Sequence, residues 1–142
     1  MTNEDLSKSY LIKAEKRLKI LDVLLEEEAY SDVVREAQEI VELSLKGMLR
    51  FVGIEPPKYH DVSPIIVEHR EKFGHISLRD IRKITRISKK LRKERELSFY
   101  GDIDFIPTEE YTVKDAREAM EGAIFVVRLA QKFITTTKDK RR

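Results

Sequence analysis

Apolar residues recur every three or four positions along four long stretches of this chain, and proline interrupts none of them. This spacing places apolar side chains along one face of an α-helix. It predicts helices over about residues 3–28, 31–52, 77–99 and 112–136. Because each such helix must bury its apolar face against another, the sequence predicts an all-α fold. We expect an antiparallel up-and-down bundle of four long helices plus one short helix.

Local signals place the ends of these helices. Asn3 and Ser31 are candidates for capping the first two helices, because their side chains can accept hydrogen bonds from free backbone amides. Gly53 stands where a helix commonly ends in a left-handed residue. A serine–proline pair at 63–64 predicts the start of the short helix, over about residues 63–72.

Length and composition limit the class of protein. A chain of 142 residues suits one domain, which we expect at residues 1–137, with a basic tail at residues 138–142. The absence of cysteine excludes disulfides, thiolate zinc sites and a cysteine nucleophile. No membrane-length apolar run and no metal-binding motif is present, so we expect a cytoplasmic protein without metal or cofactor. The many Lys, Glu, Arg and Ile residues are typical of a thermophile.

Positive charge is concentrated in one predicted helix. Residues 79–95 hold nine Lys or Arg against Asp80 and Glu94, a net +7 in a chain whose total is +2. A local basic surface of this kind can bind phosphate groups even when the whole protein is nearly neutral. The alternative is a helix face that is simply solvated.

Four segments carry a resemblance to a known family. They are residues 35–49, residues 53–62 with the His60–Asp61 pair, residues 97–102 with Tyr100 and Asp102, and residues 110–116. Their order and spacing over about residues 5–135 resemble HEPN domains. The resemblance implies a helical bundle that is often dimeric and is frequently encoded beside a small nucleotidyltransferase.

Many HEPN proteins are ribonucleases, and the resemblance implies where their motif would lie. The motif is an arginine followed, a few residues later, by a histidine. Here Arg95 has Tyr100 where that histidine would stand, and no histidine follows His75. Arg70 and His75 also have a suitable spacing, but Gly74 separates them and their place in the family order is wrong, so we interpret that match as chance.

The missing histidine favours binding over catalysis. Metal-free RNA cleavage needs a base that titrates near neutral pH, as histidine does, whereas tyrosine ordinarily titrates near pH 10. We therefore expect a non-catalytic module that binds nucleotide or RNA phosphates, as a homodimer or with a nucleotidyltransferase partner in a toxin–antitoxin-type system. The predicted ligand-binding residues are Arg82, Arg86, Lys89, Lys93, Arg95, Tyr100, Asp102 and His60.

Other interpretations remain open from the sequence. The chain could be a divergent metal-independent endoribonuclease that uses Arg95 with Tyr100, or a protein–protein assembly module. Arg95 could instead form a salt bridge with Glu94, Glu96 or Asp102. Tyr100 could be a half-buried anchor beneath the following loop, and the pair at 60–61 could be a structural cap.

Overall fold

The computed structural model describes the backbone of residues 2–58 and 61–141, and the side chains of residues 2–58 and 61–134. The long helices are α1 (Asn3–Glu26), α2 (Tyr30–Phe51), α4 (Leu78–Phe99) and α6 (Val113–Arg141). The short ones are α3 (Ser63–Glu68), the 3₁₀ helix η1 (Arg70–Phe73) and α5 (Pro107–Glu110). No strand occurs in the described residues, and the predicted all-α bundle is confirmed. None of these helices combines the length and apolar character needed to cross a membrane.

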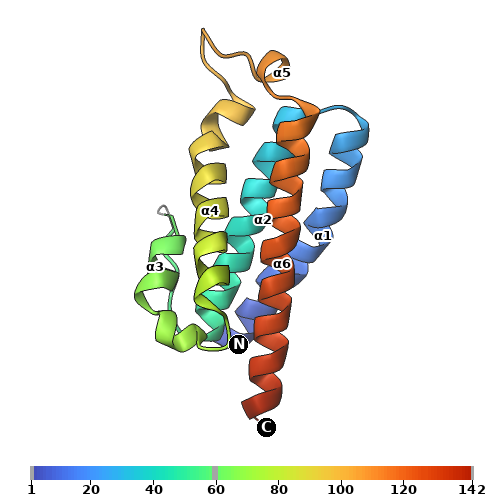
Figure 1. The fold of residues 1–142 in the computed structure, drawn as a ribbon. Helices are drawn as coiled ribbons and strands as arrows, with labels where there is room; N and C mark the ends of the chain where they lie inside the picture. The colour runs from blue at the N-terminus through green and yellow to red at the C-terminus, as the bar shows by residue number, and fades with distance from the viewer. Residues whose placement is uncertain (1, 59–60, 142) are drawn as a thin grey trace.

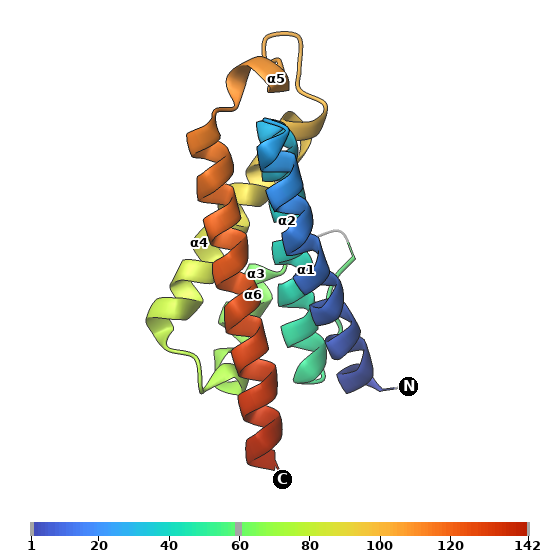
Figure 2. The same cartoon turned by 90° about the vertical axis from the view of Figure 1, so that its right-hand side faces the viewer.

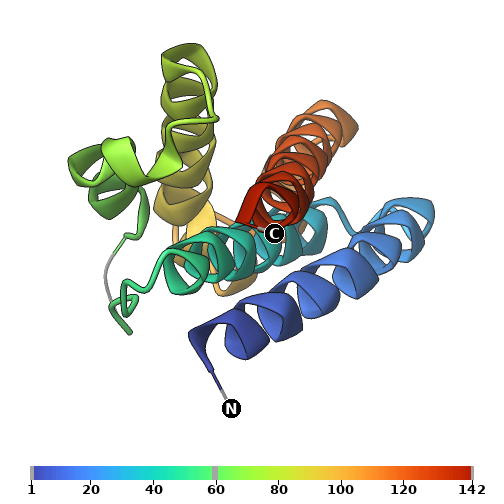
Figure 3. The ribbon, with the colours of Figure 1, turned by 90° about the horizontal axis from the view of Figure 1, so that it is seen from below.

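The chain runs alternately up and down through the four long helices (Figure 1). Figure 2 shows α5 above the long helices, and Figure 1 shows α3 beside α4, against which it packs. Helix α2 packs against α1, α4 and α6. Seen from below, it lies between α1 on one side and α4 and α6 on the other (Figure 3). The bundle is therefore organised around α2.

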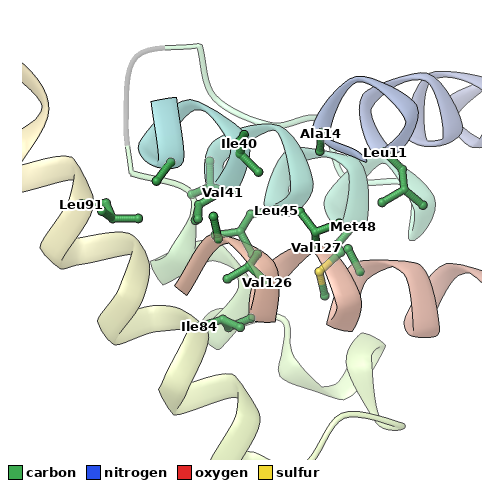
Figure 4. Close-up of a cluster of buried hydrophobic side chains, with 14 of the residues drawn as sticks. Leu11, Ala14, Ile40, Val41, Leu45, Met48, Ile84, Leu91, Val126 and Val127 are labelled. Atoms are coloured by element: carbon green, nitrogen blue, oxygen red, sulfur yellow. The ribbon is translucent and has the colours of Figure 1, made fainter. Parts of the chain in front are cut away.

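Burial explains why α2 takes the central position. Its apolar residues face three neighbouring helices, and Leu45 and Met48 are completely buried. Figure 4 shows these two side chains beside Val126 and Val127 of α6. The alanines of α6 are also buried, and small side chains allow close approach between helices. The buried alanines of α6 are Ala116, Ala119, Ala123 and Ala130.

Two predicted helix caps are wrong. Thr2, not Asn3, caps α1: its hydroxyl accepts from the Asp5 amide at 3.1 Å, and the Asp5 carboxylate accepts from the Thr2 amide at 2.9 Å. Helix α2 starts one residue before Ser31, which is buried inside the first turn. The preceding Ala29 provides no side-chain cap. A one-residue error in a helix start is enough to assign the cap to the wrong side chain.

The structure also shows how the connections between the long helices compare with the prediction. The predicted short helix over 63–72 is divided, because α3 ends at Glu68 and η1 continues the chain as a tighter turn. Helix α5 begins with Pro107 at its first turn, where the missing amide hydrogen costs no hydrogen bond. Gly53 has the left-handed conformation expected of it, with φ +82°. Helix α6 continues to Arg141 and so extends into the predicted tail.

Asp61 fastens α3 to α4. Its carboxylate accepts hydrogen bonds from the Ser63 amide at 3.1 Å and from the Ser63 hydroxyl at 3.0 Å. It also accepts a hydrogen bond from the Ser88 hydroxyl of α4 at 3.0 Å. Bonds to an ionised carboxylate are stronger than bonds between neutral groups. Asp61 therefore joins α3 to α4, together with the buried side chains of Val62, Ile66 and Phe73.

We predict that Asp61→Ala lowers the free energy of unfolding by about 2 kcal/mol, because two serine hydroxyls and one amide lose a charged partner. The melting temperature, measured by circular dichroism, should fall by about 6 °C. Ser88→Ala removes a single bond and should cost about 1 kcal/mol. Asp104→Ala, in an exposed loop, is the matched control and should leave the midpoint nearly unchanged. An Asp61→Ala protein as stable as wild type would contradict the assignment.

Candidate anion-binding site

Four cationic side chains form an exposed basic stripe along α4. They are Arg82, Arg86, Lys89 and Lys93, and all four are exposed. Successive intervals of four, three and four residues place them on one face of the helix. No hydrogen bond or ion pair engages them within the described residues. Their charges are therefore available to an anion from solution.

The neighbouring lysines of α4 are used differently. The Lys90 ammonium lies 2.5 Å from a carboxylate oxygen of Glu118 on α6. The Lys83 ammonium lies over the ring of Phe125, 4.0 Å from its centroid. Both contacts join α4 to α6, so these two charges belong to the packing of the bundle. The basic residues that cluster in the sequence thus fall into two groups, one on the exposed face of α4 and one on the face that contacts α6.

The first half of the stripe borders a surface hollow between α3 and α4. The hollow has a volume of about 390 Å³ and is lined by three arginines, Arg70, Arg82 and Arg86, which we call the arginine hollow. Its other lining residues are Val67, Leu78, Ile81 and Thr85. No carboxylate is among the lining residues that the structure describes. Three guanidinium groups in a hollow whose described lining holds no carboxylate favour an anion there.

Arg70 was not among the predicted ligand-binding residues. It lies in η1, whereas Arg82 and Arg86 lie in α4, and only the folded chain brings them to one hollow. In the sequence, Arg70 is notable only for its chance match with His75. The available signal was that a short, charged segment precedes the basic helix, but nothing in the sequence fixed how the two would pack.

Arg95 lies apart from the arginine hollow, facing α2. One of its terminal nitrogens lies 3.7 Å from a Glu39 carboxylate oxygen, and Arg35 lies 3.4 Å from the same oxygen. Arg35 also donates to the Arg95 carbonyl oxygen at 3.2 Å. Arg95 is thus in an ion pair, but its partner is on α2 and is none of the three acids suggested by sequence proximity. Its Nε is buried without a hydrogen-bond partner in the described structure.

Arg92 has a similar environment one turn earlier. It lies 2.9 Å from a Glu42 carboxylate oxygen, and Lys46 lies 3.8 Å from the other oxygen of the same group. Acidic residues of α2 therefore face two arginines of α4. These contacts partly neutralise the side of α4 that faces the bundle and leave the exposed basic stripe as its cationic outer side.

Tyr100 is at the far end of α4 and is 71% exposed. This exposure contradicts the alternative interpretation of Tyr100 as a half-buried anchor. The ring contacts Phe99 edge to face at 4.9 Å, and the guanidinium of Arg35 lies 5.2 Å from the centroid of Phe99. No hydrogen bond or ring contact joins Arg95 to Tyr100 in the described part of the chain. With a rise of 1.5 Å per residue, Tyr100 lies roughly 20 Å along α4 from Arg86.

Asp102 has a local role in the loop after α4. Its backbone pairs with Phe105, and its carboxylate accepts a hydrogen bond from the Ile103 amide at 2.7 Å. Gly101 precedes it with φ +71°, and a Cβ there would lie 2.4 Å from the Phe105 carbonyl oxygen. The turn therefore needs glycine at this position. His60 lies outside the described residues, and within them no group of three potential metal ligands gathers.

Comparison with known proteins identifies the family. The model of the HEPN domain matches residues 7–133. A crystal structure described as that of an archaeal HEPN homologue superimposes with a TM-score of 0.69, covering 90% of this chain and 97% of that one at 24% identity. That likeness shows a shared fold. No curated protein matches the sequence. Since the family model spans most of the sequence, the chain belongs to the HEPN domain family.

Proposed function

We propose that this HEPN protein is a non-catalytic module that binds the phosphate groups of a nucleotide or an RNA. The observation that carries the proposal is the arginine hollow, in which η1 and α4 bring three guanidinium groups together without a lining carboxylate. The planar guanidinium group can donate two parallel hydrogen bonds to phosphate oxygens. Lys89 and Lys93 extend the positive surface along α4.

The shape of the hollow supports a nucleotide-sized ligand. Its volume of about 390 Å³ is within the range common for small-molecule sites. Val67 and Leu78 on its wall are 41% and 48% exposed. These apolar side chains offer a surface for a sugar or base while the arginines hold the phosphates. A longer RNA could continue along the exposed basic stripe, which spans about 16 Å from Arg82 to Lys93 at 1.5 Å per residue.

The environment of Arg95 supports binding rather than cleavage. A ribonuclease built on Arg95 and Tyr100 would need the arginine free to stabilise a pentavalent phosphate. In the structure Glu39 and Arg35 already surround it. The carboxylate of Asp102, which was predicted as part of the same site, instead accepts a hydrogen bond within its own turn. Both features favour the arginine hollow over the end of α4 as the place where phosphate binds.

The proposal includes association with another protein molecule. Exposed apolar side chains gather where α4 ends and the loop to α5 begins: Phe99, Tyr100, Ile103 and Ile106. Exposed apolar groups of this kind are common at protein interfaces. We propose that a second copy of the chain covers them. A nucleotidyltransferase partner and a toxin–antitoxin-type role are further proposals that rest on family membership.

We predict that labelled single-stranded RNA binds with an affinity that falls as salt rises. For three phosphate contacts, the slope of log K against log salt should be about −2 between about 50 and 200 mM salt. Arg82→Ala and Arg86→Ala should each weaken binding and make the slope shallower by about 0.7. Lys19→Ala, an exposed change on α1, is the control. Binding that is absent at low salt, or indifferent to both arginine changes, would disprove the proposal. Competition with ATP shows whether a mononucleotide is enough to occupy the RNA-binding site.

We also predict that structured RNA remains intact when incubated with concentrated protein in EDTA. The reason is that no pair formed by Arg95 and Tyr100 is available for general acid–base chemistry. Gel electrophoresis after a long incubation provides the measurement. Cleavage that disappears in the Arg95→Ala protein would instead establish the endoribonuclease alternative. Cleavage that persists in that variant would point to a contaminating nuclease.

A further inference from the structure

A second cavity lies at the opposite end of α4 from the arginine hollow. It has a volume of about 340 Å³ and lies where α4, α5 and the first turns of α6 meet. Apolar residues from α2, α4 and α6 form much of its wall, among them Val34, Leu91, Leu97 and Ala119. Such a volume is at the lower end of the range for small-molecule sites. The cavity is therefore large enough for a compact organic ligand.

Its charge is opposite to that of the arginine hollow. Glu94, Glu110, Asp115 and Glu118 line it, against the single ammonium of Lys90, which gives a formal net charge of −3. Lys90 already pairs with Glu118 at 2.5 Å. Asp115 accepts from the Thr112 amide at 2.9 Å. The Glu110 carboxylate and the Oε1 atom of Glu94, whose Oε2 atom accepts a hydrogen bond from Tyr111, remain for a ligand.

Two aromatic rings add a further feature that favours a cation. Phe105 and Tyr111 both line the cavity and meet edge to face, with centroids 5.6 Å apart. The faces of aromatic rings attract organic ammonium groups. The Tyr111 hydroxyl donates a hydrogen bond to the Glu94 carboxylate. Burial, and then this hydrogen bond, raise the pKa of the Tyr111 phenol, so the phenol stays a neutral donor.

We propose that this cavity binds a small organic ammonium ion with an apolar body. The ammonium group contacts Glu94 and Glu110 and the face of an aromatic ring, and the apolar body packs on Leu91, Leu97 and Ala119. This assignment rests on charge complementarity together with apolar walls. It is independent of phosphate binding, because the two cavities share no lining residue.

The test is isothermal titration calorimetry of the full chain with three probes of nearly equal shape. Phenethylamine carries the positive charge, phenethyl alcohol is neutral and phenylpropionate is negative. We expect saturable binding of the amine, with an affinity about tenfold above that of the alcohol, and no detectable binding of the acid. Equal binding of amine and alcohol, or no binding of the amine at a concentration of about 10 mM, would overturn the proposal.

Variants of the carboxylates locate the site. Glu94→Gln keeps an acceptor for Tyr111 while removing the charge, and Glu110→Gln removes the second charge. The double variant should lose about tenfold in affinity for the amine. Glu121→Gln, an exposed change on α6 away from the cavity, should have no effect. Thermal melting confirms that each variant is folded. Unchanged affinity in the folded double variant would refute the assignment.

Discussion

The apolar contacts of α2 are the interaction on which the rest of the structure depends. This helix packs against α1, α4 and α6, and its buried side chains meet apolar residues from all three. Burial of apolar surface is the main favourable contribution to folding. Because the other long helices all pack on α2, their faces are fixed relative to it. The outward and inward sides of α4 are determined in this way.

That geometry decides which charges of α4 can act on a ligand. Glu39 and Glu42 project from α2 toward Arg95 and Arg92 and partly neutralise them. Ion pairs of this kind contribute modestly to stability when they are partly exposed. Their more important effect concerns charge distribution. Because α2 engages the inner arginines and α6 engages two lysines, the cations that remain free form a line on the outer side of α4.

The sequence predicted the elements of the fold better than it predicted the site. Apolar spacing identified four long helices within a few residues, because burial of one helix face leaves a direct periodic signal. The cap at Thr2 and the start of α2 at Tyr30 were missed because they depend on single-residue boundaries. The site residues required knowledge of which helix lies beside which. Arg95 finds Glu39, which is 56 positions earlier in the sequence, rather than the nearby acids, and Arg70 joins Arg82 only after folding.

The fastening of α3 by Asp61 has a thermodynamic consequence for ligand binding. Arg70 lies two residues after the end of α3, so the carboxylate that holds Ser63 and Ser88 also helps to position one wall of the arginine hollow. An anion held by both walls would cross-link η1 to α4. By linkage, an anion in the arginine hollow would then suppress local opening of residues 61–73. Weakening the hydrogen bonds of Asp61 would correspondingly lower the affinity for the anion. The local stability of this segment and the affinity for the anion are therefore thermodynamically linked.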